Sequence, residues 1–231
     1  MTTVLITGAN RGIGLEMARQ YSERGDHVIA CCRDPESADA LNALAGANLE
    51  VQKLVPTDGD SIAATVAAVG GVDILINNAG TPGPAPTDQM AMNMDFDGWM
   101  ETFNVNTMAP LKVLQGCHGL LKTSAEANGV AKAITITSQM GALDLNWPTM
   151  YAYCSSKAAV NKVMRMISVE LAKENIAVGL IHPGWVKTDM GGEQADITAE
   201  ESASGIISVV DGIDLENTGC FMKWNGEPHN W

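Results

Sequence analysis

Residues 3–14, TVLITGANRGIG, decide the fold of this chain. The apolar first half predicts a buried strand, and a helix is expected over 12–24, so a short turn must join the two. Gly8, Gly12 and Gly14 let the backbone turn tightly and approach a ligand closely. The helix N-terminus behind the turn presents N–H groups and the positive end of the helix dipole to a phosphate. The spacing G-x-x-x-G-x-G therefore predicts a phosphate-binding loop, with ordinary turn chemistry as the alternative.

Apolar runs and longer amphipathic stretches alternate along the whole chain. Strands are expected over 3–7, 27–31, 49–54, 72–77, 132–138, 176–182 and 219–224, and helices near 12–24, 35–45, 58–69, 97–122, 151–174 and 198–210. Most central runs are almost continuously apolar, as expected when helices cover both faces of a parallel sheet. We therefore predict a single α/β domain over residues 1–231, a Rossmann-type doubly wound fold whose seven-stranded sheet is mainly parallel.

Composition argues against several classes of protein. The formal net charge of -13 disfavours nucleic acid and anionic membranes as partners, because both attract basic surfaces. The five cysteines are an odd number, and neither they nor the four histidines have metal-ligand spacing. We therefore expect no metal and a reduced, cytoplasmic protein. We expect no secretory signal before the first strand and no membrane span, because no apolar run is long enough.

Charged residues follow the second predicted strand, where the adenosine ribose of a dinucleotide lies in folds of this kind. The strand is followed by Arg33 and Asp34, and Arg11 lies in the glycine loop. A pair of arginines suits a ribose 2′-phosphate, whereas an acidic residue suits two free ribose hydroxyls. Converging arginines predict NADP(H), and an Asp34 that faces the ribose predicts NAD(H). A solvated surface Arg33 beside Asp34 is the third interpretation.

Polar residues also end the fourth and fifth predicted strands. NNAG at 77–80 follows an apolar strand at the edge where open α/β sheets bind ligands, and Ser138 ends the next strand at that edge. In the helix that follows, Tyr153 and Lys157 are four residues apart and share one face, whereas Tyr151 points elsewhere. A phenol beside an ammonium group is a candidate general acid or base, with an inert surface pair as the alternative.

Together these motifs resemble the short-chain dehydrogenase/reductase family. Six of them occur in the order that the family uses: TGANRGIG at 7–14, NNAG at 77–80, NVN at 104–106, Ser138, YCSSK at 153–157 and HPGWVKTDM at 182–190. Within the family, HPGWVKTDMGG and the final GCFMKWNGEPHNW resemble the small carbonyl reductases that include the C-factor and sniffer proteins.

The resemblance implies a catalytic tetrad of Asn106, Ser138, Tyr153 and Lys157. Tyr153 would be the acid/base, with its pKa lowered by the Lys157 ammonium and by a nicotinamide cation. Lys157 would also hold the nicotinamide ribose, Ser138 would donate a hydrogen bond to the substrate oxygen, and Asn106 would hold a proton-relaying water. The implied cofactor-binding residues are Gly8, Asn10, Arg11, Gly12, Ile13, Gly14, Arg33, Asn78, Ala79, Gly80, Tyr153, Lys157, Pro183, Val186 and Thr188.

The same resemblance implies an NADP(H)-dependent carbonyl reductase, or alcohol dehydrogenase in reverse, with a small-molecule carbonyl or alcohol substrate. The alternatives are an NAD(H)-dependent alcohol dehydrogenase and a cofactor-binding signalling protein with negligible catalysis. The substrate pocket is expected among the loops near 80–96, 139–151 and 184–200, with Trp147 and Trp185 as candidate aromatic walls. By analogy with relatives, we expect a homodimer or homotetramer.

Two stretches depart from the family pattern. Val55 and Pro56 stand where the family usually has an Asp that contacts adenine, and Asp58 comes three residues too late. The segment after the TDM motif is short and predicts an open substrate pocket. The methionine-rich stretch at 88–100 is interpreted as packing for a loop and a helix start rather than as substrate contact.

Overall fold

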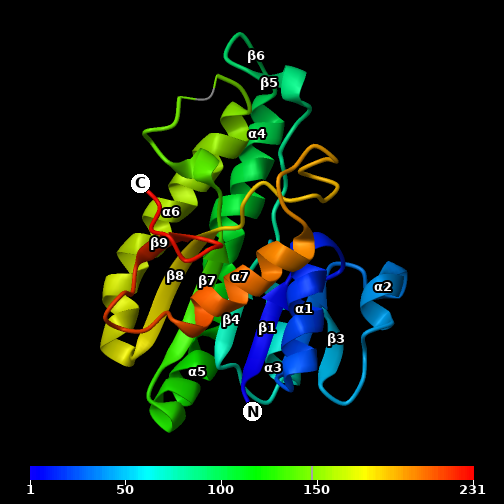
Figure 1. The fold of residues 1–231 in the computed structure, drawn as a ribbon, viewed down its shortest axis with the longest axis vertical. Helices are drawn as coiled ribbons and strands as arrows, with labels where there is room; N and C mark the ends of the chain where they lie inside the picture. Colours follow the sequence, from blue (N-terminus) through cyan, green and yellow to red (C-terminus); the bar gives the residue numbers. More distant parts are fainter. Residues whose placement is uncertain (147) are drawn as a thin grey trace.

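The structure, a computed structural model, describes residues 1–146 and 148–231. Its centre is a sheet of seven strands in the order β3-β2-β1-β4-β7-β8-β9, in which all neighbouring strands are parallel (Figure 1). The strands are β1 (Thr3–Thr7), β2 (His27–Cys32), β3 (Leu49–Lys53), β4 (Ile74–Asn77), β7 (Ala131–Ile136), β8 (Ile176–His182) and β9 (Cys220–Lys223). Along the chain, β1, β2 and β3 extend the sheet toward one edge, and β4, β7, β8 and β9 then extend it toward the other edge. This order confirms the predicted doubly wound fold.

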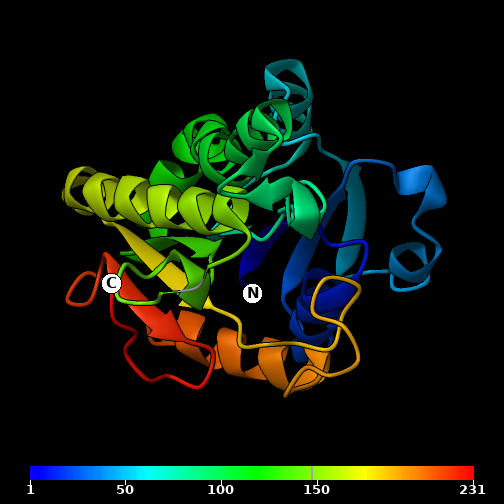
Figure 2. The ribbon, with the colours of Figure 1, turned by 90° about the horizontal axis from the view of Figure 1, so that it is seen from above.

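Helices cover both faces of the sheet (Figure 2). Helices α1 (Gly12–Arg24) and α7 (Ala199–Asp211) pack against each other on one face. The other face carries α3 (Gly59–Ala68), α5 (Ala109–Asn128) and α6 (Tyr151–Leu171). Successive side chains of β1 point to opposite faces: Val4 and Ile6 join the core under α1 and α7, and Leu5 joins the core under α3, α5 and α6. A strand buried on both faces explains why its sequence is apolar without alternation.

Two predicted helices are interrupted in the structure. The helix expected over 35–45 is replaced by a 3₁₀ turn (Pro35–Ser37) and the short α2 (Asp39–Asn42), because Ala38 between them leaves helical dihedral angles. The helix expected over 97–122 consists of α4 (Phe96–Phe103), a π-helical segment (Asn104–Met108) and α5. Single π turns inside helices are rare and occur often at functional sites.

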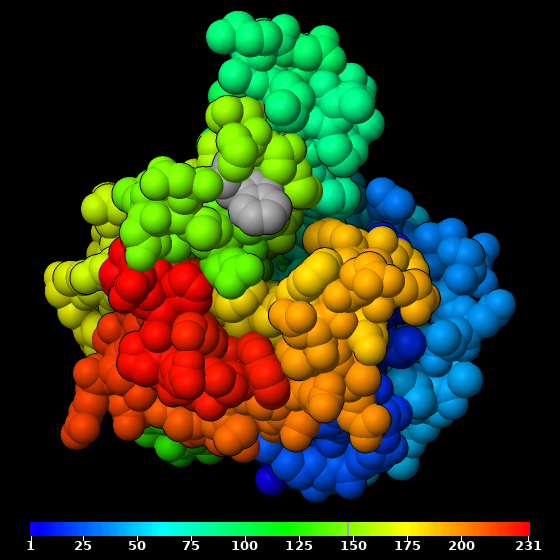
Figure 3. Space-filling model, turned by 45° about the horizontal axis from the view of Figure 1, so that its top comes forward, coloured from blue at the N-terminus to red at the C-terminus, as the bar shows by residue number. Residues whose placement is uncertain are grey.

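The methionine-rich stretch is more exposed than expected. It forms a 3₁₀ turn (Pro86–Asp88) and a two-stranded hairpin, β5 (Gln89–Met90) and β6 (Asn93–Met94), which projects from the body of the molecule (Figure 3). Met92 at its tip is 98% exposed. The packing interpretation is therefore wrong for the tip, because an isolated two-stranded hairpin has no layer against which to bury both faces.

Across residues 1–146 and 148–231, none of the helices has the combined length and apolar character needed to cross a membrane. The same residues include no group of three or more His, Cys, Asp or Glu side chains arranged to hold a metal ion.

Candidate active site

The glycine loop lies at the point where the strand order reverses. It follows β1, whose neighbour β4 ends in Asn77, so the loop and the segment after β4 meet at the carboxyl edge of the sheet. Open α/β sheets bind ligands in the crevice at this point. The glycine loop, predicted from the sequence to bind phosphate, therefore lies at the edge where folds of this kind bind ligands.

Backbone packing around the glycine loop leaves no room for side chains. Gly8 (φ 68°) and Gly12 (φ 55°) have left-handed backbone conformations. A Cβ at Gly14 would lie 2.3 Å from the carbonyl oxygen of Gly8 and 2.5 Å from Nδ2 of Asn78. Helix α1 begins here with Arg11 at its N-cap and has no acidic residue in its first turn. These features fit a dinucleotide pyrophosphate, which needs close backbone approach and free N–H groups. In the same loop Asn10 is exposed, whereas Ile13 packs against the core.

The segment after β4 is tied to the end of β1 by hydrogen bonds. Asn78 Nδ2 donates to the carbonyl oxygens of Thr7 (3.0 Å) and Gly8 (3.1 Å). The Thr7 hydroxyl accepts from the backbone N–H groups of Asn78 (3.0 Å) and Ala79 (3.1 Å). Asn78 and Ala79 thus brace the glycine loop. Thr7 could not be identified from the sequence, because its partners lie about 70 residues away.

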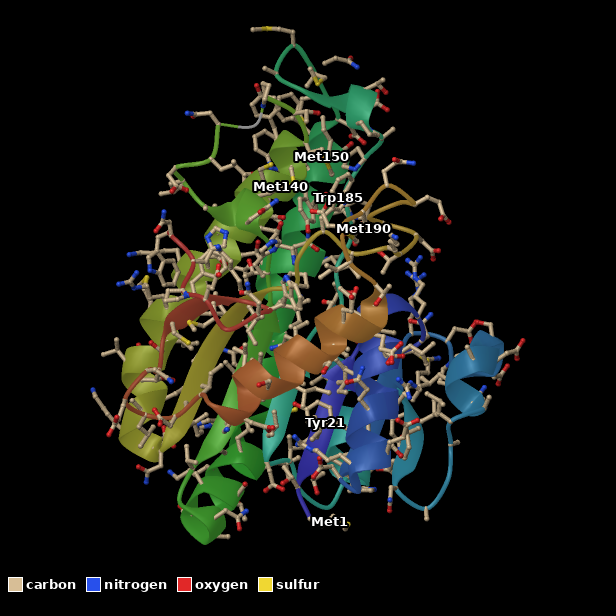
Figure 4. The ribbon with its side chains drawn as sticks, in the orientation of Figure 1. Met1, Tyr21, Met140, Met150, Trp185 and Met190 are labelled. Carbon is tan, nitrogen blue, oxygen red and sulfur yellow. The ribbon has the colours of Figure 1, made fainter. Side chains whose placement is uncertain are left out.

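The loop after β8 lies over the glycine loop. Val186 is buried and pairs with Ile197, which closes the loop on itself. A Cβ at Gly12 would lie 3.3 Å from Cγ2 of Thr188, so the predicted cofactor residue Thr188 borders the glycine loop. Figure 4 shows Trp185 and Met190 on this loop, at the same end of the molecule as Met140 and Met150. Trp147, the other candidate aromatic wall, lies outside the described residues.

The loop after β8 is also joined to the glycine loop by an ion pair. Nη1 of Arg11 lies 2.5 Å from Oδ2 of Asp189, and both side chains are well exposed. Arg33 is exposed, and among the described residues it forms no ion pair. The carboxylate of Asp34 accepts a hydrogen bond from the Ser37 hydroxyl at 2.7 Å. The convergence of Arg11 and Arg33 on one phosphate therefore stays a prediction, and the pairing with Asp189 was not foreseen.

Ser138, Tyr153 and Lys157 meet at the carboxyl edge of β7. Strand β7 ends at Ile136, two residues earlier than expected, and Ser138 starts a short 3₁₀ turn in which its hydroxyl accepts from Met140 N at 3.1 Å. The Lys157 ammonium donates to the Ile136 carbonyl oxygen at 3.1 Å and lies 5.7 Å from the centroid of the Tyr153 ring. The two helical residues and the serine after the neighbouring strand are therefore brought together as predicted.

Burial dominates the electrostatics of these groups. Removal of solvent around the hydroxyl raises the pKa of Tyr153, and a hydrogen-bonding contribution from Ser138 opposes the rise. Burial lowers the pKa of Lys157 to about 8. The expectation that Lys157, together with a nicotinamide cation, lowers the pKa of Tyr153 stays a prediction. The Lys157 ammonium, which donates to the Ile136 carbonyl oxygen, is itself buried.

Asn106 lies in the π-helical segment and is buried. Its Oδ1 accepts from Thr81 N (2.9 Å), and its Nδ2 donates to the Thr81 carbonyl oxygen (2.9 Å) and to the Ser156 hydroxyl (3.0 Å). A Cβ at Gly80 would lie 3.2 Å from Asn106 Oδ1 and 3.7 Å from the Lys157 ammonium nitrogen. Asn106 thus joins the loop after β4 to α6, and its predicted water-holding role stays a prediction.

The stretch after β3 has another structural role. Val55 N donates to the Ser61 hydroxyl at 2.9 Å, and the Asp58 carboxylate accepts from Asp60 N at 3.0 Å as the N-cap of α3. Asp58 therefore starts a helix, and the expectation that it does not replace the missing adenine contact stays a prediction.

The burial of His182, the last residue of β8, determines how the stability of the protein is expected to depend on pH. It is buried, its Nδ1 has no hydrogen-bond partner among the described residues, and burial lowers its pKa from 6.5 to about 4. Between these values the unfolded chain binds a proton that the folded chain excludes, so stability falls as pH decreases below about 6.5. We expect His182 to remove about 2 kcal/mol of unfolding free energy between pH 7.5 and pH 5. Urea unfolding at pH 7.5 and at pH 5 measures this loss of unfolding free energy.

The matched variant is His182→Leu, which has no titratable group at this position. Between pH 7.5 and pH 5, its unfolding free energy should fall by about 2 kcal/mol less than that of the wild type. An identical fall in both proteins would show that His182 does not carry the effect.

The parallel sheet and the glycine loop define a Rossmann-type α/β protein, and comparison with known proteins gives its family. The short chain dehydrogenase family model matches residues 2–198. The C-signal of Myxococcus xanthus is 37% identical over 170 residues, which are 73% of this chain and 98% of that protein. The chain belongs to the short-chain dehydrogenase/reductase family.

Solved structures support the same subgroup as the sequence motifs. The carbonyl reductase Sniffer of D. melanogaster matches with a TM-score of 0.94 and 30% identity over 100% of both chains. The NADPH-bound carbonyl reductase from chicken fatty liver matches with a TM-score of 0.92 and 35% identity, over 100% of this chain and 99% of that one. The predicted resemblance to carbonyl reductases of this kind is confirmed.

Proposed function

We propose that this protein is an NADP(H)-dependent oxidoreductase that interconverts a small-molecule carbonyl compound and its secondary alcohol. The observation that carries the proposal is the cluster of Ser138, Tyr153 and Lys157 at the same sheet edge as the glycine loop. General acids of this kind act only where the donor reaches the reacting oxygen, and these side chains come from adjacent elements at one edge.

Each residue has a distinct proposed role. The bound nicotinamide cofactor would supply the hydride that reduces the carbonyl carbon. Tyr153 would transfer its hydroxyl proton to the carbonyl oxygen, and the Ser138 hydroxyl would donate a hydrogen bond to that oxygen while negative charge develops on it. Lys157 would bind the nicotinamide ribose hydroxyls and stabilise the Tyr153 phenolate that remains. Asn106 would orient the loop after β4 and a water that returns a proton to the site.

The preference for NADP(H) is proposed from charge. Arg11 lies in the glycine loop and Arg33 directly follows β2, the two places from which side chains would reach a ribose 2′-phosphate, and the Asp34 carboxylate already accepts a hydrogen bond from Ser37. The NADPH-bound chicken carbonyl reductase is among the matching structures. Because Arg11 is paired with Asp189, binding of a 2′-phosphate would exchange one anionic partner of Arg11 for another.

A titration of the purified protein with NADPH and NADH, read by tryptophan fluorescence, tests this preference. We expect the wild type to bind NADPH more tightly. Replacing Arg11 and Arg33 together by Gln should weaken NADPH binding by about tenfold and change NADH binding little, because two charge-assisted contacts to the 2′-phosphate are lost.

A matched control replaces Lys162 and Lys173 by Gln, which removes two positive charges elsewhere on the surface. It should leave both affinities unchanged. Equal losses for NADPH and NADH in the arginine variant would contradict the 2′-phosphate role. Tighter NADH binding by the wild type would favour the NAD(H)-dependent alternative.

The similarity to the C-signal of Myxococcus xanthus favours one second candidate, a cofactor-binding signalling protein with negligible catalysis. The presence of Ser138 together with Tyr153 argues against it, because cofactor binding alone does not require a proton donor and an oxyanion donor. Tight NADPH binding with no reduction of any ketone or diketone would support this candidate. The cytoplasmic location, the homo-oligomer and the pocket formed by the loops near 80–96, 139–151 and 184–200 stay predictions.

A further inference from the structure

Gln89, the first residue of β5, is fully buried although its hairpin projects into solvent. Its side-chain amide is completely engaged. Nε2 donates to the carbonyl oxygens of Pro82 (2.9 Å) and Pro84 (2.6 Å), and Oε1 accepts from the backbone N–H of Tyr153 (3.1 Å). One side chain thus connects the loop after β4 with the first turn of α6.

Helix α6 needs such a partner because its own N-cap supplies none. Met150 at the N-cap has a left-handed conformation (φ 53°, ψ 44°), and within the described residues no side chain of the preceding segment caps the helix. The first N–H groups of a helix have no partner inside the helix, and a Met side chain has no oxygen to offer them. The Gln89 amide oxygen fills this place for Tyr153 from 64 positions away in the sequence.

Resting on the proposed function, we propose that Gln89 is a positioning residue. It caps the N-terminus of α6 from outside the helix and thereby keeps the Tyr153 hydroxyl in place beside Ser138. Tyr153 lies in the first turn of α6, so fraying of that turn moves its hydroxyl. Lys157 lies one turn deeper and is held by the Ile136 carbonyl, so it stays in place.

The chemistry of the site selects an amide side chain. The three partners are one N–H donor and two carbonyl acceptors, so the residue must accept one hydrogen bond and donate two. Gln offers both functions on one planar group, whereas an ionised Glu only accepts and Met has only a weakly accepting sulfur. Two other bonds at this end of α6, from Trp99 Nε1 to the Ser155 hydroxyl (2.9 Å) and from Asn106 Nδ2 to the Ser156 hydroxyl (3.0 Å), do not involve Gln89 and keep α6 docked without it.

Two substitutions distinguish the hydrogen bond that Gln89 accepts from α6 from the two hydrogen bonds that it donates to the loop after β4. Gln89→Met keeps the length of the side chain and removes all three hydrogen bonds. Gln89→Glu keeps an acceptor for Tyr153 N and removes the two donors to the loop. With NADPH and 2,3-butanedione, or whichever diketone the wild type reduces fastest, we expect kcat of the Met variant to fall by about 10- to 30-fold. We expect KM and the NADPH dissociation constant to stay within about threefold of the wild type, because Lys157, the proposed ligand of the nicotinamide ribose, keeps its bond to the Ile136 carbonyl oxygen.

The Glu variant should recover most of the lost kcat, because it restores the bond to Tyr153 N. Gln115→Met, an exposed position on α5, is the control and should leave all constants unchanged. An unchanged kcat in the Met variant overturns the proposal, and so do equal losses in the Met and Glu variants. Should the Met variant fail to fold by circular dichroism, the Glu variant alone decides: a kcat within about threefold of the wild type supports the cap, and a loss of about tenfold or more overturns it. A wild type that reduces no carbonyl compound refutes the proposed function itself, before any variant is compared.

Discussion

Replacing Tyr153 by Phe should lower kcat for carbonyl reduction by about 10²- to 10⁴-fold, because the substitution removes only the hydroxyl that donates the proton. The ring, its distance to the Lys157 ammonium and the fold of α6 are retained. NADPH binding should therefore stay within about threefold of the wild type. Steady-state kinetics with a diketone and a fluorescence titration with NADPH measure the two effects separately.

The chain offers a matched control two residues earlier. Tyr151 lies on the same helix and is exposed, so Tyr151→Phe removes a hydroxyl from the same turn that has no part in the proposed proton transfer. Its kcat should remain close to that of the wild type. Substantial turnover by Tyr153→Phe, or equal losses in the two variants, would assign the proton transfer to another group.

The pKa directions in this site bear on the direction of the reaction. Because burial raises the pKa of Tyr153, its hydroxyl is protonated at neutral pH and is ready to donate a proton, as carbonyl reduction requires. Alcohol oxidation requires the phenolate as a base, and therefore a pKa below that of a free tyrosine. The direction of this shift is consistent with the proposed carbonyl reduction, in which Tyr153 donates the proton. Lys157, with a pKa of about 8, loses its charge at alkaline pH, so its support for the phenolate weakens there.

Sequence patterns predicted the sheet because the signals that form it are local. The central strands β2, β1, β4, β7 and β8 are largely apolar runs buried on both faces, and the run over 176–182 was predicted with the bounds that β8 has in the structure. The interruption of the long helix by the π-helical segment at 104–108 could not be predicted in this way. The segment NVNTM contains neither Gly nor Pro, and the extra residue in its turn is accommodated by the tertiary contacts of Asn106 with Thr81 and Ser156.

The candidate catalytic residues could be predicted because their motifs resemble those of the family in kind and order, but the residues that hold them could not. Gln89, Asp189 and Thr7 act on Tyr153, Arg11 and Asn78 through contacts that span 64, 178 and 71 positions of the chain. A single glutamine or threonine carries no periodic signal in a sequence. Only the fold shows that its polar atoms meet unsatisfied backbone groups at the site.

Gly14→Ala should weaken NADPH binding by about 10- to 100-fold and lower the unfolding free energy by about 1–3 kcal/mol. Gly14 is buried in the first turn of α1, and its φ angle is accessible to alanine, so the expected effect comes from space alone. The added methyl group would lie 2.3 Å from the Gly8 carbonyl oxygen and 2.5 Å from Asn78 Nδ2. One contact is with backbone, which cannot rotate away as a flexible side chain does. Relief of the clash must therefore move α1 away from the loop that it supports.

The control for this substitution is Gly119→Ala. Gly119 is also a helical glycine, in α5, but a Cβ there meets no atom within 4 Å. Alanine at an open helical position should stabilise the protein by up to about 1 kcal/mol, through its higher helix propensity, and leave NADPH binding unchanged. The two variants thus make the same chemical change with opposite expected signs in stability. If Gly14→Ala kept both its NADPH affinity and its urea midpoint, the tight packing of α1 against Gly8 and Asn78 would not be what shapes the phosphate loop.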